Sequence, residues 1–505
     1  MRGASAAWVL TAAIVASAIV FIDGTAVNVA LPVLGRDLHA ATASIQWVVE
    51  SYALSLSALL LVGGAAGDRY GRRRIFALGS ALFGVASVAC GFAPNAAMLI
   101  AARFVQGIGA AFATPGSLAL ISSCFEGEDR GKAIGTWSGF TTVVSAIGPL
   151  LGGWLTQTVS WRAVFFLNVP LVVVVLGISA LHVPESRDPD AKGPPDVAGA
   201  LLAAFSLGAL AFGLTRGQGT LDAYDVGAIA AGLMLLAAFV VRERTASNPM
   251  MPLALFANRT FAGANLYTLL VYAALGGSLF YIPFDLQSVQ GYSPEAAGAS
   301  LLPFIVIMFV LSRWSGGLIS RIGARVPLVA GALIAAAGFA AFALAGLDRP
   351  YWVSFFPAAC MLGFGAALFV APLTTTVMSA VGDEHSGVAS GINNAVSRVA
   401  GLIAIGAIGF VLLGIFYRDL DRSVDVAHLQ PQTRAALAAG RAELPQIVVP
   451  PAAPARDRPA VRRMLRLSYT DGFRSAMLAG AALCVLASLI AWIVLRPRPR
   501  EARNR

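Results

Sequence analysis

The stretch Gly63-Gly-Ala-Ala-Gly-Asp-Arg-Tyr-Gly-Arg-Arg-Arg74 is a short hydrophilic segment between two long apolar runs. Its four arginines predict a loop on the cytoplasmic side of a membrane, where loops rich in basic residues are retained. Its glycines allow two helix ends to approach closely, and Asp68 can pair with a neighbouring arginine or cap a helix N-terminus. We therefore expect a tight turn that takes part in gating, with a purely topogenic basic loop as the alternative.

The composition of the whole chain is that of a polytopic membrane protein. Of its 505 residues, 57% are hydrophobic and only 12% are charged, about half the charged fraction of an average soluble protein. The net charge of +10 comes mainly from loops and tails, so topology explains it better than nucleic-acid binding does. The scattered cysteines show no metal-type spacing, so we expect neither a zinc site nor a disulfide framework. They are Cys90, Cys124, Cys360 and Cys484.

Apolar windows of roughly twenty residues predict the membrane spans. We count fourteen of them, at 8–32, 46–66, 75–93, 96–119, 133–155, 162–182, 196–214, 223–241, 261–284, 294–318, 325–346, 351–379, 387–416 and 473–495. The first run is too long for a signal peptide, so we expect it to remain as a helix. An even number of spans places both termini on one side, and the arginine-rich short loops of that side make it the cytoplasm.

The opening segment returns in weaker form at 316–325, where Ser320 stands in place of the aspartate. The matched pairs are Gly64 with Gly316, Arg69 with Arg321, Gly71 with Gly323, and Arg73 with Arg325. Eight spans separate the copies instead of six, so two extra helices lie between the halves, most simply spans seven and eight. Paired halves around a central cavity are what alternating access requires.

Four motifs resemble those of major facilitator superfamily transporters. The segment 63–74 fits the pattern of the loop between spans two and three through Gly64, Asp68, Arg69, Gly71, Arg72 and Arg73. The run from Arg103 to Ala111 resembles the fourth-span motif R-x-x-Q-G-x-G-A-A. The run from Asp23 to Pro32 is similar to the first-span signature of the fourteen-span drug:proton antiporters. In span five, the pattern G-P-x-x-G-G associated with antiporters is matched by Gly148, Pro149, Gly152 and Gly153, although Val144 replaces its first glycine.

The resemblance covers nearly the whole chain and implies an all-α major facilitator fold with fourteen spans. It implies an N-terminal six-helix bundle at 1–190, two linker helices at 191–245 and a C-terminal six-helix bundle at 246–505. Within the last part we expect a long outer loop at 417–470 and a cytoplasmic tail at 496–505. The Pro/Ala-rich segment 445–459 is expected to lack packed structure.

Ionisable side chains inside spans are costly, so each is a functional hypothesis. Asp23 and Glu50 are the candidate proton-binding groups, and Arg103, which keeps its proton, would act on a carboxylate electrostatically. A structural ion pair or cap is the alternative for Asp23 and Arg103, and a solvated interfacial position is the alternative for Glu50. The candidate substrate-cavity residues are Asn28, Gln106, Trp137, Asp285, Asn394 and Arg398, of which Asp285 is also open to an interfacial, solvated placement.

The resemblance implies a proton-coupled secondary transporter that exports drugs or other amphipathic small molecules. If Asp23, Glu50 and Asp285 face its cavity, their carboxylates favour a cationic substrate. The proton gradient would supply the energy, with no cofactor and no metal. No catalytic signature or P-loop occurs in the sequence, so we expect no enzyme. Export of an endogenous metabolite, lipid or siderophore, import of a nutrient, and a non-transporting sensor or scaffold remain open.

The expected location is the inner membrane of a bacterial cell, with both termini cytoplasmic. The expected partners are protons, a small-molecule substrate and the lipid bilayer, and not nucleic acid. A periplasmic adaptor would join them in a host with an outer membrane.

Overall fold

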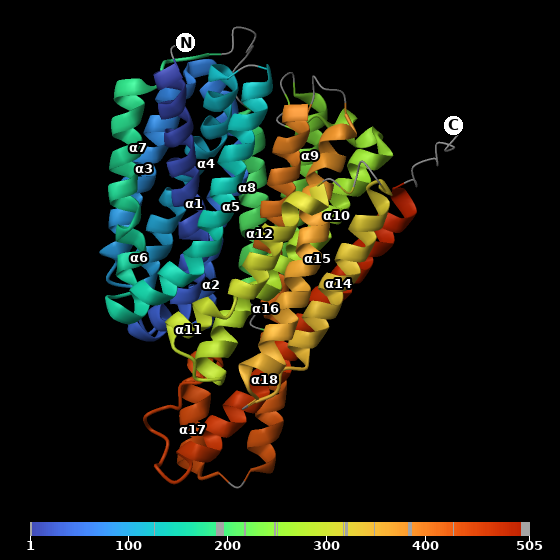
Figure 1. Cartoon of the computed structure of the whole chain (residues 1–505). Helices are drawn as coiled ribbons and strands as arrows, with labels where there is room; N and C mark the ends of the chain where they lie inside the picture. The colour runs from blue at the N-terminus through green and yellow to red at the C-terminus, as the bar shows by residue number, and fades with distance from the viewer. Residues whose placement is uncertain are drawn as a thin grey trace. The chain divides into compact units, whose positions relative to one another are not determined.

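The computed structural model is almost entirely helical (Figure 1). It describes residues 3–495 except 126, 188–195, 217–218, 247–248, 250, 317, 319–321, 348, 382–385 and 428, and no strand occurs in these ranges. The prediction of an all-α fold is therefore confirmed. The predicted tail 496–505 lies outside the described residues.

The helices form two compact units. Unit 1 comprises Met1–Met250, Phe280–Ala299 and Leu413–Tyr469, and unit 2 comprises Met251–Leu279, Ser300–Leu412 and Thr470–Arg505. Both predicted linker helices thus belong to unit 1. The division of the chain at 190 and 245 into two six-helix bundles and a linker pair stays a prediction.

Unit 1 contains most of the described secondary structure. Its elements are α1 (Gly3–Asp37), α2 (Thr42–Tyr70), α3 (Arg72–Gly91), α4 (Ala96–Cys124), α5 (Gly127–Thr158), α6 (Arg162–Phe166), α7 (Asn168–His182), α8 (Val197–Arg216), α9 (Ala223–Thr245), the π-helix η2 (Asp285–Val289), α11 (Pro294–Ala299), α17 (Pro431–Ala439) and the 3-10 helix η4 (Arg441–Gln446). Within it α2 and α3 pack along α4, α1 packs along α5, and α8 pairs with α9.

Unit 2 is built from the remaining elements. It holds the 3-10 helix η1 (Leu253–Ala257), α12 (Leu302–Gly316), α14 (Arg325–Ala343) and α15 (Tyr351–Ser379), with the larger parts of α10 (Arg259–Phe284), α16 (Ser386–Val426) and α18 (Arg458–Val494). Here α15 packs along both α14 and α12.

Within the described residues, twelve helices are long and apolar enough to cross a membrane, or thirteen if the two pieces of α2, bent by 48°, form one span. These thirteen correspond to thirteen of the fourteen predicted windows. The remaining window, 133–155, lies within α5, which is not among the candidate spans. The multi-pass character of the protein is thus established, whereas the count of fourteen is not confirmed.

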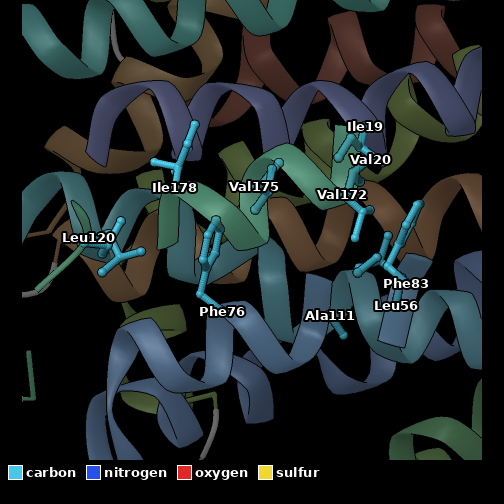
Figure 2. Packing of buried hydrophobic residues seen from close by; sticks show 14 of the residues in the cluster. Ile19, Val20, Leu56, Phe76, Phe83, Ala111, Leu120, Val172, Val175 and Ile178 are labelled. Carbon is cyan, nitrogen blue, oxygen red and sulfur yellow. The ribbon is translucent and has the colours of Figure 1, made fainter. Parts of the chain in front are cut away.

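Aliphatic and aromatic side chains from five helices fill the interior of unit 1. Figure 2 shows this cluster, with Ile19 and Val20 of α1, Leu56 of α2, Phe76 and Phe83 of α3, Ala111 and Leu120 of α4, and Val172, Val175 and Ile178 of α7. Asp23 follows Ile19 and Val20 at four and three residues, so it lies on the same face of α1. Packing therefore places a carboxylate beside an apolar core.

The outer loop predicted at 417–470 is mostly helical. Helix α16 continues to Val426, α18 already begins at Arg458, and α17 and η4 lie between them. The buried residues Leu413, Phe416, Tyr417 and Leu420 have helical spacing, and the Phe416 ring packs edge-on against Tyr469. We call residues 413–469 the cap. It lies at the end of unit 1 opposite the N-terminus (Figure 1).

The expectation that 445–459 lacks packed structure is wrong. Ala453 in this segment is fully buried, and Asp457 accepts hydrogen bonds from the backbone of Gln430 and the hydroxyl of Thr433. Proline and alanine are compatible with packed turns when neighbouring helices supply the apolar contacts and the hydrogen-bond donors, and here α17 and α18 do so.

Candidate functional site

Asp23 lies at the centre of a buried polar network between α1, α3, α4 and α7. Its side chain is 0% exposed and that of its ion-pair partner Arg103 is 1% exposed. The carboxylate also accepts hydrogen bonds from Gln106 at 3.0 Å and from Asn168 at 3.0 Å. Three donors from two helices thus converge on one carboxylate.

The Arg103 guanidinium is held on several sides. Its Nε donates to the Val48 carbonyl at 3.0 Å, and one terminal nitrogen donates both to Asp23 and to Gln106 at 2.7 Å. The guanidinium also lies 4.1 Å from the ring centre of Tyr52, a cation–π contact. Arginine keeps its proton in proteins, so in this network the carboxylate is the group able to bind and release one.

Two members of the network are not among the site residues predicted from the sequence. Asn168 begins α7, and Ser87 of α3 accepts a hydrogen bond from Gln106 at 2.8 Å. Both are buried. The one sequence signal for Asn168 is a polar residue inside an otherwise apolar window. Cys90 lies at the edge of the network, 3.7 Å from the Gln106 side-chain oxygen.

Glu50 lies at a different place, facing the predicted linker helix α8. Its side chain is 0% exposed, and both carboxylate oxygens accept from the hydroxyl of Thr215, at 3.2 and 3.0 Å. The alternative of a solvated, interfacial Glu50 therefore does not describe this structure. Burial of a carboxyl without a nearby cation is costly, which makes it a candidate for a protonated group.

Asp285 is also buried, at 1% exposed, in the π-helical turn η2. One of its oxygens accepts from Gln290 at 3.3 Å. Neighbouring Gln287 donates to the Val29 carbonyl of α1 at 2.8 Å, so this turn packs on α1 within unit 1. The interfacial, solvated placement of Asp285 is thus also absent here, although Asp285 does not join the Asp23 network.

The basic turn at 63–74 is clamped by a residue from elsewhere. Gly71, with φ of 116°, separates α2 from α3, and Asp68 pairs with Arg72 at 2.8 Å. The carboxylate of Glu185 accepts hydrogen bonds from the backbone amides of Arg73 at 3.0 Å and Arg74 at 3.2 Å. It therefore occupies the N-terminus of α3, a favourable place for an anion.

Glycine is needed at particular positions of this turn. A Cβ at Gly71 would come within 2.8 Å of the Glu185 carboxylate, besides the strain of a positive φ. A Cβ at Gly64 would make an ordinary contact with Pro115, whereas one at Gly63 would collide with the Ala111 carbonyl of α4. Of these two glycines, Gly63 is the one that lets α2 approach α4 closely. Arg69 lies 5.5 Å from the ring centre of Tyr70.

The weaker second copy shares part of this geometry. Gly323 has φ of 76° and precedes the start of α14, as Gly71 precedes α3. The Arg325 guanidinium stacks 3.7 Å from the ring centre of Trp492. Ser320 and Arg321 lie outside the described residues.

The span-five motif packs α5 against α1 and α11. A Cβ at Gly148 would collide with the Thr25 hydroxyl, and one at Gly152 would lie 2.7 Å from the Ala26 Cα. On α11, the backbone of Pro294 lies against Gly153, and Gly298 lies against the Pro149 carbonyl. The motif therefore closely contacts the segment of α1 that follows Asp23.

The remaining predicted cavity residues have separate surroundings. Trp137 of α5 donates to Ser17 of α1 at 2.9 Å. Asn28 is half-buried, and its side-chain oxygen has no hydrogen-bond partner among the described residues. In unit 2, Arg398 is half-buried and Asn394 is exposed.

The asparagine that carries the polar contact in unit 2 is the neighbour of the predicted one. Asn393 donates to Asn265 of α10 at 3.2 Å and to Thr268 of α10 at 2.6 Å. The sequence has adjacent asparagines at 393 and 394, and it does not show which of them faces α10.

A buried ion pair among apolar membrane-crossing helices, a clamped basic turn and glycine-packed helix contacts define a transport protein of the membrane. The chain belongs to the major facilitator superfamily, whose family model matches residues 13–405. The suspected family is thereby confirmed.

The relatives of this chain include several resistance and export proteins. It is 34% identical to the Multidrug resistance protein Stp of Mycobacterium tuberculosis (strain CDC 1551 / Oshkosh), over 94% of this chain and 89% of that one. It is 32% identical to the Tetracenomycin C resistance and export protein of Streptomyces glaucescens, over 97% and 92%. It is 36% identical to the Lincomycin resistance protein of Streptomyces lincolnensis, over 78% and 82%.

Solved structures share the fold. A bacterial homologue of the human lysosomal transporter Spinster, in an inward-facing and unoccupied conformation, aligns with a TM-score of 0.65 at 19% identity and 98% coverage of both chains. A D-xylose–proton symporter aligns with a TM-score of 0.61 at 14% identity, over 97% of this chain and 98% of the other.

Proposed function

We propose that the protein exports drugs or related amphipathic small molecules, mainly cations, from the cytoplasm in exchange for protons. Resistance and export proteins among its relatives support export, and so does the span-five glycine motif at 148–153. The observation that carries the proton coupling is the fully buried pair of Asp23 and Arg103. A carboxylate that holds three donors changes its contacts whenever it takes up a proton.

Asp23 acts as the switch of the cycle. The deprotonated carboxylate ties α1 to α4 through Arg103 and Gln106, and to α7 through Asn168. Proton uptake from outside removes the charge that these donors share, which weakens the ties and allows α1 to shift. Release of the proton to the cytoplasm, as the substrate binds, restores them, and the loaded carrier then turns outward.

The surrounding elements fit this cycle. Glu185 and the basic turn stabilise one of the two states by fixing the start of α3. If they face the substrate cavity, the carboxyls of Asp23, Glu50 and Asp285 would favour a cationic substrate over an anionic one. The driving force is the proton gradient, with no cofactor and no enzymatic step.

The proposal includes the topology of the protein and its location in the cell. The basic turn at 63–74 and both termini lie on the cytoplasmic side, and the cap lies outside. The membrane is a bacterial inner membrane. In a host with an outer membrane, a periplasmic adaptor is a further partner.

Inside-out vesicles with an acidic lumen and a fluorescent pH probe test this function. Addition of ethidium should dissipate the pH gradient in wild type, and Asp23→Asn should abolish the response. Asp37→Asn is the matched control, because Asp37 lies on the same helix but pairs near the surface with Trp161 and Arg162. It should keep most of the response.

Two other outcomes would contradict parts of this proposal. No response from normally inserted wild type would reject cation export and direct attention to metabolite, lipid or siderophore substrates on the same fold. A response that survives Asp23→Asn would keep the antiporter and move the proton site, first to Glu50.

A further inference from the structure

We propose that the α8–α9 hairpin is part of the transport machinery, because Thr215 of α8 positions Glu50 as a second proton-binding group. This inference rests on the proposed proton-coupled export and extends it to a helix pair that sequence alone marked as a linker between two halves.

The contact between Thr215 and Glu50 is fully buried. Thr215 is 2% exposed, Glu50 is 0% exposed, and the hydroxyl lies 3.0 and 3.2 Å from the two carboxylate oxygens. Within the described part of the chain, Thr215 supplies the one hydrogen bond to Glu50, and no ion pair reaches this carboxyl. A hydrogen bond to the charged form favours that form, so this hydroxyl governs how readily Glu50 binds a proton.

The hairpin holds Thr215 firmly in place. Ser206 of α8 donates to the Gly232 carbonyl of α9 at 2.9 Å, which joins the two helices in their middle. At the turn, Arg216 pairs with Asp222 at 2.8 Å and with Asp225 at 2.7 Å. A hydrogen bond from the Asp225 backbone amide holds the pKa of the Asp222 carboxyl below its usual range, and the hydrogen bond from Arg216 adds a smaller effect in the same direction. These ties stay intact at neutral pH and fix the end of α8 next to Thr215.

The C-terminal half of α8 also packs against α2 at further points. The Phe212 ring lies 6.5 Å from that of Trp47, and a Cβ at Gly208 would come within 3.3 Å of Leu54. The hydrogen bond at Glu50 is therefore one point of a continuous helix contact. A change of charge at Glu50 acts directly on that contact.

Several charged groups near α2 are paired with one another. They are Arg103 with Asp23, Arg216 with Asp222 and Asp225, Arg441 of η4 with Asp421, and Arg162 with Asp37. From α10, the phenol of Tyr281 interacts electrostatically with Glu50 and accepts a hydrogen bond from Gln46. In the described chain no arginine or lysine forms an ion pair with Glu50, so a proton is the species that can neutralise it.

The test is the pH dependence of ethidium uptake into inside-out vesicles, with the bath pH fixed and the lumenal pH varied. Thr215→Val keeps the side-chain shape but removes the hydroxyl. Without that donor the charged carboxylate is less favoured, so the lumenal pH of half-maximal rate should rise by about one unit. Thr215→Ser keeps the hydroxyl and should leave the midpoint at the wild-type value.

Two further variants separate positioning from mere stability. In a Glu50→Gln background, Thr215→Val should cause no additional shift, because the carboxylate on which it acts is gone. Ser206→Ala loosens the hairpin without touching Glu50, so it should lower the rate or the yield but not move the midpoint. Rates are normalised to the amount of inserted protein.

The proposal is overturned if Thr215→Val has the wild-type midpoint, or if its shift persists in the Glu50→Gln background. If wild type exchanges ethidium for protons normally, either of these results would reject only the role of the hairpin and would leave the export proposal standing. An absence of exchange in wild type would overturn the export proposal together with it.

Discussion

The carboxylate of Glu185 lies 3.0 Å from the backbone nitrogen of Arg73, so a residue that follows α7 caps the first turn of α3. A second oxygen of the same carboxylate accepts from the Arg74 amide at 3.2 Å. The preceding residue, Arg72, donates its backbone amide to the Ser186 carbonyl at 2.9 Å. The segment that follows α7 thus accepts hydrogen bonds from backbone amides in the first turn of α3, which have no partner within the helix.

The first prediction concerns this clamp. Glu185→Ala removes two charge-assisted hydrogen bonds and should destabilise the start of α3 by about 1–2 kcal/mol. Ethidium transport should fall several-fold, and the melting temperature of the purified protein should drop. Glu295→Ala, which removes an exposed carboxylate near another helix start, is the control and should change neither measurement. Equal behaviour of the two variants would reject a role for the clamp.

The second prediction concerns the shape of the Arg103 side chain. Arg103→Lys keeps the charge, but a single ammonium cannot reach the Val48 carbonyl, Asp23 and Gln106 at once. Transport per inserted molecule should fall at least about tenfold, since a partly unsatisfied buried pair costs several kcal/mol. Arg36→Lys replaces an arginine on α1 whose Nε donates to the Pro32 carbonyl and should retain transport. Full activity of Arg103→Lys would show that charge alone suffices.

The network around Asp23 could be predicted from the sequence only in part. Asp23 and Arg103 stood out because charges are rare inside membrane spans, and Gln106 followed from its spacing on the same helix face. Asn168 and Ser87 did not stand out, because neutral polar residues inside spans are common. Their role depends on how α3 and α7 pack against α4, which no local pattern specifies.

The cap shows a different reason for a missed feature. Its charges and prolines are typical of a loop, although Leu413, Phe416 and Leu420 have helical spacing. Glu185 was missed for a third reason, since its partners lie more than a hundred residues earlier in the chain. Local rules predicted the spans well, whereas contacts between distant segments required the structure.

The third prediction concerns close helix packing in the span-five motif. A methyl group at Gly148 would collide with the Thr25 hydroxyl on α1, two residues after Asp23. Gly148→Ala should therefore shift α5 away from α1, lower the melting temperature and reduce transport at least about tenfold, because overpacking costs about 1–3 kcal/mol. Gly24→Ala is the matched control on α1, since a Cβ there meets no atom within 4 Å. Comparable loss in both variants would mean that helix propensity, not the contact, matters.

The last prediction concerns what holds the cap together. Asp457 is buried and accepts from the Gln430 backbone and the Thr433 hydroxyl, whereas Asp421 is an exposed partner of Arg441. Exposed ion pairs contribute little, but loss of a buried acceptor leaves two donors unpaired at about 1–3 kcal/mol each. Asp457→Ala should therefore speed hydrogen exchange across α17 at least about fivefold, and Asp421→Ala should leave it near the wild-type rate. The opposite order would place the stability of the cap in its surface charges, because the two variants differ chiefly in the burial of the carboxylate that each removes.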